Sequence, residues 1–112
     1  MKLKRENNRI YFNYDEKSFA NVSIDNGFAK IELIKTLPKF RNKKLASKLL
    51  NKIINYLLKE KKFKHLYANP LPLNHEGLNL EQLIMFYEKH GFIKVKDKSK
   101  HEPYLMVREL NS

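Results

Sequence analysis

The amino-acid sequence predicts a mixed α/β fold, in which antiparallel strands come first and a strand, helix, strand, helix order follows. Three observations support this prediction. Short runs of aromatic and β-branched residues fill the first third of the chain, a long amphipathic pattern follows, and a short apolar run then ends at prolines. Two strands joined through a helix are expected to pair in parallel. The length of 112 residues suits one domain, residues 1–112, with its own apolar core.

Three strands are predicted in the first third of the chain. Residues 9–14, 19–24 and 28–36 are rich in side chains that favour extended structure. Polar turn signals at residues 15–17 and 25–27 separate the three runs. Because these turns are short, the strands are expected to form an antiparallel meander.

Two helices are predicted after the meander. The first runs from residue 42 or 43 to about residue 61, because apolar residues recur at the spacing of one helix face: Leu45, Leu49, Leu50, Ile53, Ile54, Leu57 and Leu58. The second helix begins at Asn79, which has Gln82 three residues later as the partner of a capping box. Gly91 is expected to stop it.

Three further strands are predicted around the second helix. Residues 64–68 form a short apolar run between the two helices, and Pro70 ends it. Residues 92–96 and 104–110 are expected to close the chain as a hairpin around a polar turn.

The composition excludes several classes of protein. The chain has no cysteine, which excludes disulfide bonds, thiolate catalysis and the usual structural zinc sites. Its charged start is unlike a signal peptide, and no apolar run approaches the ~20 residues that span a bilayer. We therefore expect a cytoplasmic protein without a membrane segment, either a monomer or a homodimer.

The chain is strongly basic, with a formal net charge of +11. Such a charge suits nucleic-acid binding, which depends on the neutralisation of phosphates. However, only four of the 23 basic residues are arginine, the residue expected at bidentate phosphate or guanine contacts. We therefore rank a nucleic-acid module below a protein whose charge favours acidic partners.

Residues 37–50 predict an anion site. A strand passes through a basic turn into an amphipathic helix, so free backbone N–H groups and positive charge face the same place. Arg41 and Lys43 stand at the helix start, where cations oppose the helix dipole. That conflict favours a bound anion over simple solvation of the two side chains.

Two motifs together carry a family resemblance. Arg41 and Ala46 match the pattern Arg or Gln, two residues, Gly, one residue, Gly or Ala; further on, Phe86-Tyr87 is followed by Gly91-Phe92. From about residue 28 to its end, the chain resembles the Gcn5-related N-acetyltransferases, the GNAT family. The resemblance implies a GNAT-like fold and acetyl-CoA as co-substrate.

The resemblance also implies which residues contact acetyl-CoA. In the family the fourth strand splays from its neighbour and pairs with the pantetheine arm, and the next helix points its N-terminus at the pyrophosphate. The matching residues are Ile34, Lys35 and Thr36 on the strand, and Arg41, Asn42, Lys43, Lys44, Leu45, Ala46 and Ser47 in the turn and helix start.

Lys44 departs from the family pattern, because it stands where glycine is usual. Glycine allows close approach of the backbone to a ligand. Two alternatives follow for this position. The backbone of Lys44 still donates and its ammonium adds a contact to phosphate, or its side chain fills the cradle and the protein is a relative that has lost the cofactor.

The resemblance implies two catalytic residues. Tyr87 matches the tyrosine that gives a proton to the departing thiolate; a phenol with an ordinary pKa of about 10 is protonated at neutral pH. Glu32 matches the general base on the splayed strand, and strand alternation places it on the face of Ile34 and Thr36. Apolar neighbours would raise its pKa toward neutrality. The alternatives are a core tyrosine and a surface glutamate paired with lysine.

Other ionisable residues provide weaker candidates. His75 and Glu76 lie before the second helix and are the rival base pair. His65 and His90 are expected to be ordinary, partly exposed histidines. No His, Asp and Glu set has the spacing of a metal site, so no metal is expected.

The predicted function is an acetyl-CoA-dependent N-acetyltransferase. Family members usually begin with a strand and two helices that wall the acceptor groove, whereas here the meander reaches the cofactor strand without them. An open groove suits a protein lysine or N-terminus as the acceptor, as in short, often phage-borne members. The alternative is a catalytically inactive basic module that binds nucleic acid or an acidic protein.

Overall fold

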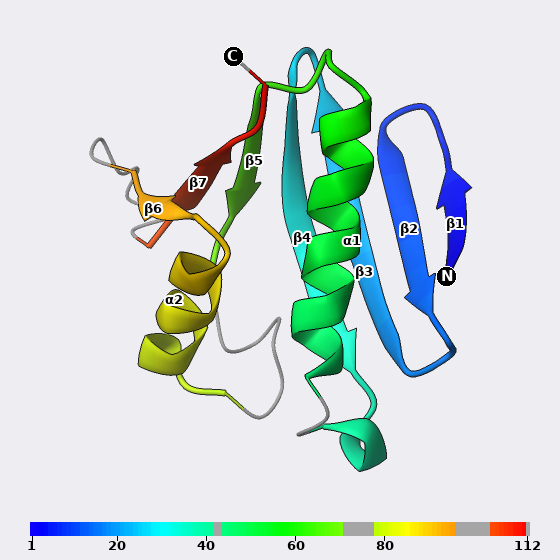
Figure 1. Cartoon of the computed structure of the whole chain (residues 1–112), viewed down its shortest axis with the longest axis vertical. Coiled ribbons are helices and arrows are strands. Elements are labelled where there is room, and N and C mark those ends of the chain that lie inside the picture. Colours follow the sequence, from blue (N-terminus) through cyan, green and yellow to red (C-terminus); the bar gives the residue numbers. More distant parts are fainter. Residues whose placement is uncertain (42–43, 71–77, 96–103, 112) are drawn as a thin grey trace.

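A computed structural model describes residues 1–41, 44–70, 78–95 and 104–111 (Figure 1). It confirms the mixed α/β fold. Within these residues, two α-helices and a short 3₁₀ helix accompany a seven-stranded sheet. The elements are β1 (Lys2–Arg5), β2 (Arg9–Tyr14), β3 (Ser18–Asp25), β4 (Phe28–Thr36), η1 (Pro38–Phe40), α1 (Leu45–Lys59), β5 (His65–Ala68), α2 (Leu80–Lys89), β6 (Ile93–Lys94) and β7 (Met106–Glu109).

The strand order in the sheet is β1-β2-β3-β4-β5-β7-β6. The first four strands form the predicted antiparallel meander, and β5 pairs in parallel with β4 across α1, as expected for a strand, helix, strand unit. The C-terminal hairpin is confirmed, although its strands are shorter than predicted and β7 inserts between β5 and β6. β1 was not predicted, because all four of its residues are exposed and carry no apolar alternation.

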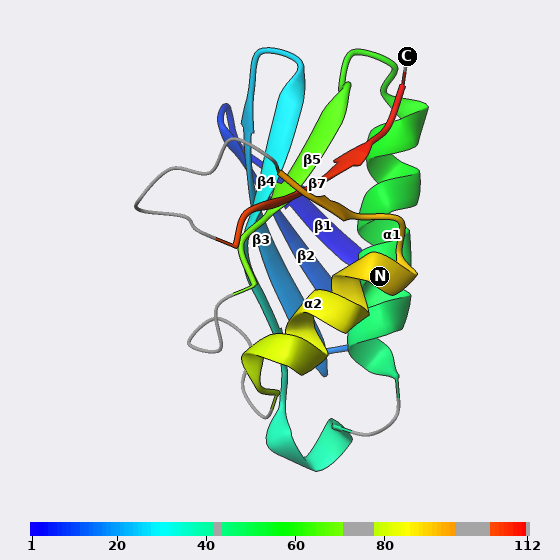
Figure 2. The same ribbon diagram turned by 90° about the vertical axis from the view of Figure 1, so that its left-hand side faces the viewer.

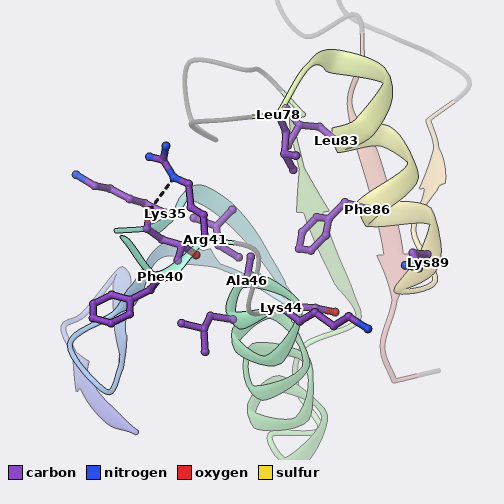
Figure 3. Close-up of a pocket in the computed structure, with 13 residues that line it drawn as sticks. Lys35, Phe40, Arg41, Lys44, Ala46, Leu78, Leu83, Phe86 and Lys89 are labelled. Atoms are coloured by element: carbon purple, nitrogen blue, oxygen red, sulfur yellow. Dashed lines mark hydrogen bonds between the residues drawn. The ribbon is translucent and has the colours of Figure 1, made fainter. Parts of the chain in front are cut away.

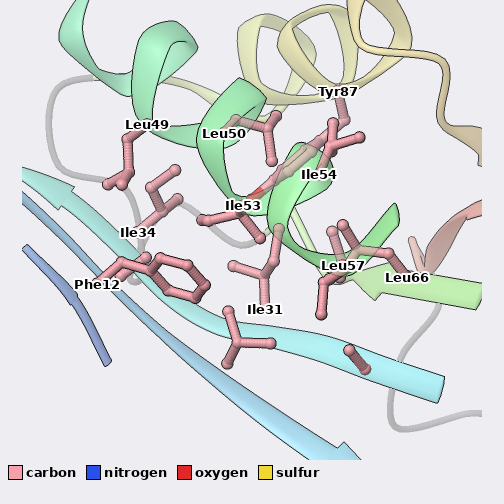
Figure 4. Packing of buried hydrophobic residues seen from close by; sticks show 14 of the residues in the cluster. Phe12, Ile31, Ile34, Leu49, Leu50, Ile53, Ile54, Leu57, Leu66 and Tyr87 are labelled. Atoms are coloured by element: carbon pink, nitrogen blue, oxygen red, sulfur yellow. The ribbon is translucent and has the colours of Figure 1, made fainter. Parts of the chain in front are cut away.

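The core lies between the sheet and α1 (Figure 4). The apolar stripe predicted for the first helix is largely buried: Leu45, Leu49, Leu50, Ile53, Ile54 and Leu57. Tyr87 of α2 belongs to the same core cluster as Ile31 and Ile34 of β4 and as all of these helix residues except Leu45. Both helices therefore cover one face of the sheet (Figure 2).

The helix ends differ from the prediction at α1 and agree with it at α2. Lys44 has φ 57° and ψ 25°, which is left-handed and incompatible with a continuing right-handed helix, so α1 begins at Leu45. At α2 the capping box is present: the Asn79 side chain accepts from the Gln82 N–H at 2.9 Å, and the Gln82 side chain accepts from the Asn79 N–H at 3.0 Å. Gly91, with φ 87°, follows the helix as predicted.

β4 extends beyond its pairing with β5. The ladder between them runs from Phe28 opposite His65 to Ile31 opposite Ala68, whereas β4 continues to Thr36. Among the described residues, the β5-facing edge of β4 therefore has no strand partner after Ile31. The sheet opens there, at the end of β4 nearest the start of α1.

None of the helices in the described ranges is long and apolar enough to cross a membrane.

Candidate functional site

A cavity of about 610 Å³ lies where β4 ends and α1 begins, and α2 forms its opposite wall (Figure 3). Its volume is within the range of small-molecule sites. The described lining residues are Ile34, Lys35, Thr36, Phe40, Arg41, Lys44, Leu45, Ala46, Ser47, Leu78, Leu83, Phe86 and Lys89.

The lining has two chemically different parts. Four of its thirteen described residues are cationic and none is acidic. Lys35 and Arg41 come from one side, and Lys44 and Lys89 from the other. Leu83 and Phe86 add an apolar wall on α2. Such a cavity suits a ligand that has an anionic group and a longer uncharged arm.

The start of α1 contributes backbone donors. The first helical hydrogen bond runs from the Lys48 N–H to the Lys44 carbonyl at 3.1 Å. The N–H groups of Leu45, Ala46 and Ser47 therefore precede the helical ladder, and no side chain of the described residues caps them. Because the positive end of the helix dipole adds to these donors, the cavity favours an anion here.

Lys44 takes the backbone conformation that glycine would adopt at this position. Its φ of 57° is left-handed, a region that costs a residue with a Cβ roughly 1–2 kcal/mol. The side chain lines the cavity and extends toward α2, and the volume between Arg41 and Phe86 stays open. The turn thus keeps the form of a glycine turn and gains an ammonium group.

Arg41 is positioned by the end of β4. Its Nε donates to the Thr36 carbonyl at 3.3 Å, which ties the turn back to the strand. Figure 3 shows its guanidinium beside the Lys35 side chain. The two side chains concentrate positive charge at the same edge of the cavity.

The structure brings together every predicted cofactor residue that it describes. Eight line the cavity: Ile34, Lys35, Thr36, Arg41, Lys44, Leu45, Ala46 and Ser47. Asn42 and Lys43 lie outside the described residues. The sequence analysis missed Phe40, Leu78, Leu83, Phe86 and Lys89 as lining residues. For Leu83, Phe86 and Lys89 the one signal is their spacing of three, which also fits an ordinary core-facing stripe.

Tyr87 lies behind the cavity wall. Its side chain is wholly buried, and its ring makes edge contacts with the rings of Phe86 at 5.2 Å and Phe92 at 5.1 Å between centroids. Figure 4 shows it beneath α1, near Leu50 and Ile54. Burial raises the pKa of Tyr87 far above its ordinary value, so the phenol is neutral at any physiological pH.

Glu32 lies on the sheet face away from α1, so the prediction that it shares a face with Ile34 is wrong. The register with β3 shifts at this point: Val22 pairs with Ile31 and Asn21 with Leu33. Glu32 is the extra residue of this bulge, which resets the alternation of β4. Its Oε1 accepts from the Ser23 hydroxyl at 2.9 Å.

The other histidine and glutamate candidates do not lie together in the described structure. His75 and Glu76 lie outside the described residues. His65 lies on β5, with its ring 6.1 Å from that of Tyr67. His90, expected to be ordinary, bonds to Ser47 of the cavity lining at 2.8 Å. Across the described ranges, no group of three or more His, Asp and Glu side chains is arranged to hold a metal ion.

Comparisons with known proteins agree with this geometry. A family model described as an acetyltransferase (GNAT) domain matches residues 6–94. No curated protein matches the sequence. Among solved structures, the ribosomal-protein-S18-alanine N-acetyltransferase from Escherichia coli is similar, with a TM-score of 0.73 at 16% identity over 96% of this chain and 73% of that one.

Two further structures extend the likeness. The anti-CRISPR protein AcrVA5 has a TM-score of 0.71 at 16% identity, over 89% of this chain and 97% of its own. The GNAT family N-acetyltransferase YhbS from Escherichia coli, in complex with CoA, has a TM-score of 0.64 at 14% identity, over 91% of this chain and 58% of that one. At identities this low the structural likeness shows the fold alone, whereas the family model covers most of the chain and shows the family. The chain therefore belongs to the GNAT family of N-acetyltransferases.

Proposed function

We propose that this protein transfers an acetyl group from acetyl-CoA to a primary amine, which is a protein lysine or N-terminus. One observation carries the proposal. Within the segment matched by the family model, the cavity at the start of α1 has four cationic and no acidic residues among those described. This is the charge pattern that a diphosphate requires.

The residues of the cavity fit acetyl-CoA as a co-substrate. The N–H groups at the start of α1, together with Arg41, Lys44 and Lys89, would hold the diphosphate. The β5-facing edge of β4 after Ile31 offers backbone groups to the pantetheine arm, and Phe86 and Leu83 cover that arm from α2. Acetyl-CoA supplies an activated thioester, so the protein need only position the amine and move protons.

Tyr87 is the proposed proton donor for the departing sulfur. Its burial keeps the phenolic proton in place across the working pH range. The same burial makes the phenol a weak acid, so the transfer is favourable only while the sulfur carries a negative charge in a similarly dry environment. Phe86, which lines the cavity and packs against the Tyr87 ring, would contribute to such an environment.

Glu32 is the proposed base, and it indicates the side from which the acceptor arrives. It lies where β4 separates from β5, on the face that neither helix covers. The Ser23 hydroxyl holds one carboxylate oxygen. β1 and β2 are joined by only three residues, so in the described chain no helix lies between them. A large acceptor such as a protein chain can approach this open face.

Turnover tests the proposal directly. The protein is mixed with acetyl-CoA and a peptide library that carries lysine side chains and free N-termini, and release of free CoA is measured. We expect amine-dependent release, and a fall in kcat of about 10²-fold or more in Tyr87→Phe. Tyr56→Phe is the matched control, because that phenol lies near the far end of α1, bonded to Arg5 at 3.2 Å, and outside the cavity.

Two results would contradict the proposal. Absence of release with every amine tested would remove the acetyltransferase activity and favour the basic binding module. Equal activity of Tyr87→Phe, Tyr56→Phe and the wild type would remove Tyr87 as the proton donor.

A further inference from the structure

A chain of three polar side chains reaches the cavity from behind the start of α1. The Ser47 hydroxyl lies 2.8 Å from Nε2 of His90, and Nδ1 of His90 lies 3.1 Å from Oδ1 of Asn51. Ser47 and Asn51 are one turn apart on α1, and His90 is the C-cap of α2. Of the three, only Ser47 lines the cavity.

The partners fix the tautomer of His90. Oδ1 of Asn51 is an acceptor, so Nδ1 of His90 carries a proton. In the neutral imidazole Nε2 is then an acceptor, and the Ser47 hydroxyl donates to it. The Ser47 hydroxyl therefore donates its proton to a hydrogen bond with His90, and this proton points away from the cavity.

The surroundings keep His90 neutral when no anion is bound. Its described contacts are Ser47 and Asn51 from α1, the Phe86 ring and Lys89 from α2, and Arg108 from β7, whose Nε donates to the His90 carbonyl at 2.9 Å. None of these is a carboxylate. Burial first, and then the charges of Lys89 and Arg108, lower the pKa of His90 below its ordinary value of 6.5.

An anion beside Ser47 would instead favour the protonated form of His90. Protonated His90 donates from both nitrogens, to Asn51 at Nδ1 and to Ser47 at Nε2. The Ser47 hydroxyl then accepts from His90, and its own proton is free to turn toward an anion in the cavity. The added positive charge on His90 is also favourable beside an anion.

We propose that Ser47 and His90 form a proton-coupled subsite for the diphosphate of the co-substrate: the Ser47 hydroxyl donates to a phosphate oxygen while His90 takes up one proton from solvent. This inference rests on the proposed function, because it assumes that the diphosphate lies at the start of α1. It assigns to His90 a role in binding, through Ser47, and it makes the affinity for the co-substrate depend on pH.

A different chemistry is possible for the same three groups. A hydroxyl, an imidazole and an amide in sequence also resemble a nucleophile, its base and an orienting group. In that case the Ser47 oxygen would attack the thioester carbon, its proton would pass through His90 to the departing sulfur, and an acyl ester of Ser47 would remain. The cationic lining around Ser47 favours the diphosphate over the thioester at this position.

Calorimetry with dephospho-CoA tests the inference. Dephospho-CoA has the diphosphate but no phosphomonoester, and a phosphomonoester would itself titrate near pH 6. Binding is measured from pH 5.5 to 7.5 in pairs of buffers with different ionisation enthalpies. We expect uptake of up to one proton per site, and affinity that falls by up to tenfold per pH unit between the pKa of His90 in the free and bound protein.

The sign of the pH effect follows from the charge. The anion raises the pKa of His90, so affinity is highest below the pKa of the free protein and falls as pH rises toward the pKa of the complex. His90→Gln should bind with little pH dependence and no proton uptake. His65→Gln, which changes a histidine on β5 outside the cavity, should behave as the wild type. The wild-type His90 titration, followed by NMR with and without dephospho-CoA, needs no variant.

The outcomes separate this inference from the proposed function. Binding without proton uptake, with an unshifted His90 titration, would overturn the inference and leave the proposed function standing. An acyl ester on Ser47, detected by mass spectrometry after incubation with acetyl-CoA, would also overturn it. Absence of dephospho-CoA and acetyl-CoA binding at every pH would overturn both.

Discussion

Lys44 combines an unfavourable backbone conformation with a charged side chain in the cavity lining. It adopts a left-handed backbone conformation immediately before α1, although lysine has a Cβ that disfavours this region. Its ammonium lies in the lining beside Lys89. Compared with glycine, lysine at this position therefore makes the turn less stable but adds a positive charge to the cavity lining.

Substitution of Lys44 separates these two effects. Lys44→Gly removes the strained Cβ, and it should raise the free energy of unfolding by about 0.5–1 kcal/mol even though glycine is more flexible in the unfolded chain. Lys44→Ala keeps the Cβ and loses the charge, so its stability should be within about 0.5 kcal/mol of the wild type. Urea denaturation measures both. Equal stabilities of the glycine and alanine variants would contradict the strain.

The outcome at Glu32 shows what residue patterns cannot predict. Alternation along β4 placed Glu32 with Ile34, but the bulge opposite Asn21 and Val22 moves it to the other face. A bulge depends on the register with a neighbouring strand, which is a property of two segments. Arg41 and Ser47, which the sequence motif placed together, do line one cavity, because they are local to one turn and helix start.

At the scale of elements, periodicity determined what could be predicted. α1 and α2 were predicted because their apolar spacing and the Asn79 cap are local signals. β1 has no such signal, and it is held instead by its ladder with β2 and by the hydrogen bond of Arg5 to Tyr56 of α1. Phe86 and Leu83 were missed as lining residues, because the same apolar stripe can face a core or a cavity.

Arg5 joins β1 to the end of α1. It donates to the hydroxyl of Tyr56 at 3.2 Å and forms an ion pair with Glu60, the C-cap of that helix. Each side chain of the ion pair is about 30% exposed, and Oε2 of Glu60 is buried without a hydrogen-bond partner among the described residues. The edge strand and the helix are therefore coupled by partly desolvated charge.

A double-mutant cycle measures this coupling. Arg5→Met should lower the free energy of unfolding by about 1–2 kcal/mol, because it leaves the Glu60 carboxylate partly buried and unpaired. In the Arg5→Met, Glu60→Met double variant much of that loss should be recovered, giving a coupling energy of about 1 kcal/mol. Lys2 and Glu16 are the control pair: Nζ of Lys2 lies 3.2 Å from Oε1 of Glu16, and the two side chains are 82% and 64% exposed. Their coupling should be close to zero. Equal coupling in the two pairs would contradict the role of burial.

At the scale of the whole molecule, the two faces of the sheet differ. One face packs against α1 and α2 and contains the core, and the cavity opens at one end of that layer. The opposite face has no helix over it in the described chain, and it exposes Tyr11, Phe28 and Leu33. β4 separates from β5 after Ile31. The cavity lies on the helix side of this opening, and Glu32 lies on the opposite side. Under the proposed function, the co-substrate and a large acceptor would approach from different sides.

The central claim is that the cationic cavity at the start of α1 binds the diphosphate of acetyl-CoA, and calorimetry of acetyl-CoA binding to matched arginine variants tests it most directly. Arg41→Gln removes a charge from the cavity lining, whereas Arg9→Gln removes the same charge from β2, where Arg9 bonds to Asn21 at 3.1 Å. The account predicts saturable binding to the wild type and to Arg9→Gln, and affinity at least about tenfold weaker in Arg41→Gln, as expected for loss of a charged hydrogen bond. No heat at millimolar acetyl-CoA, or equal weakening in both variants, would contradict it.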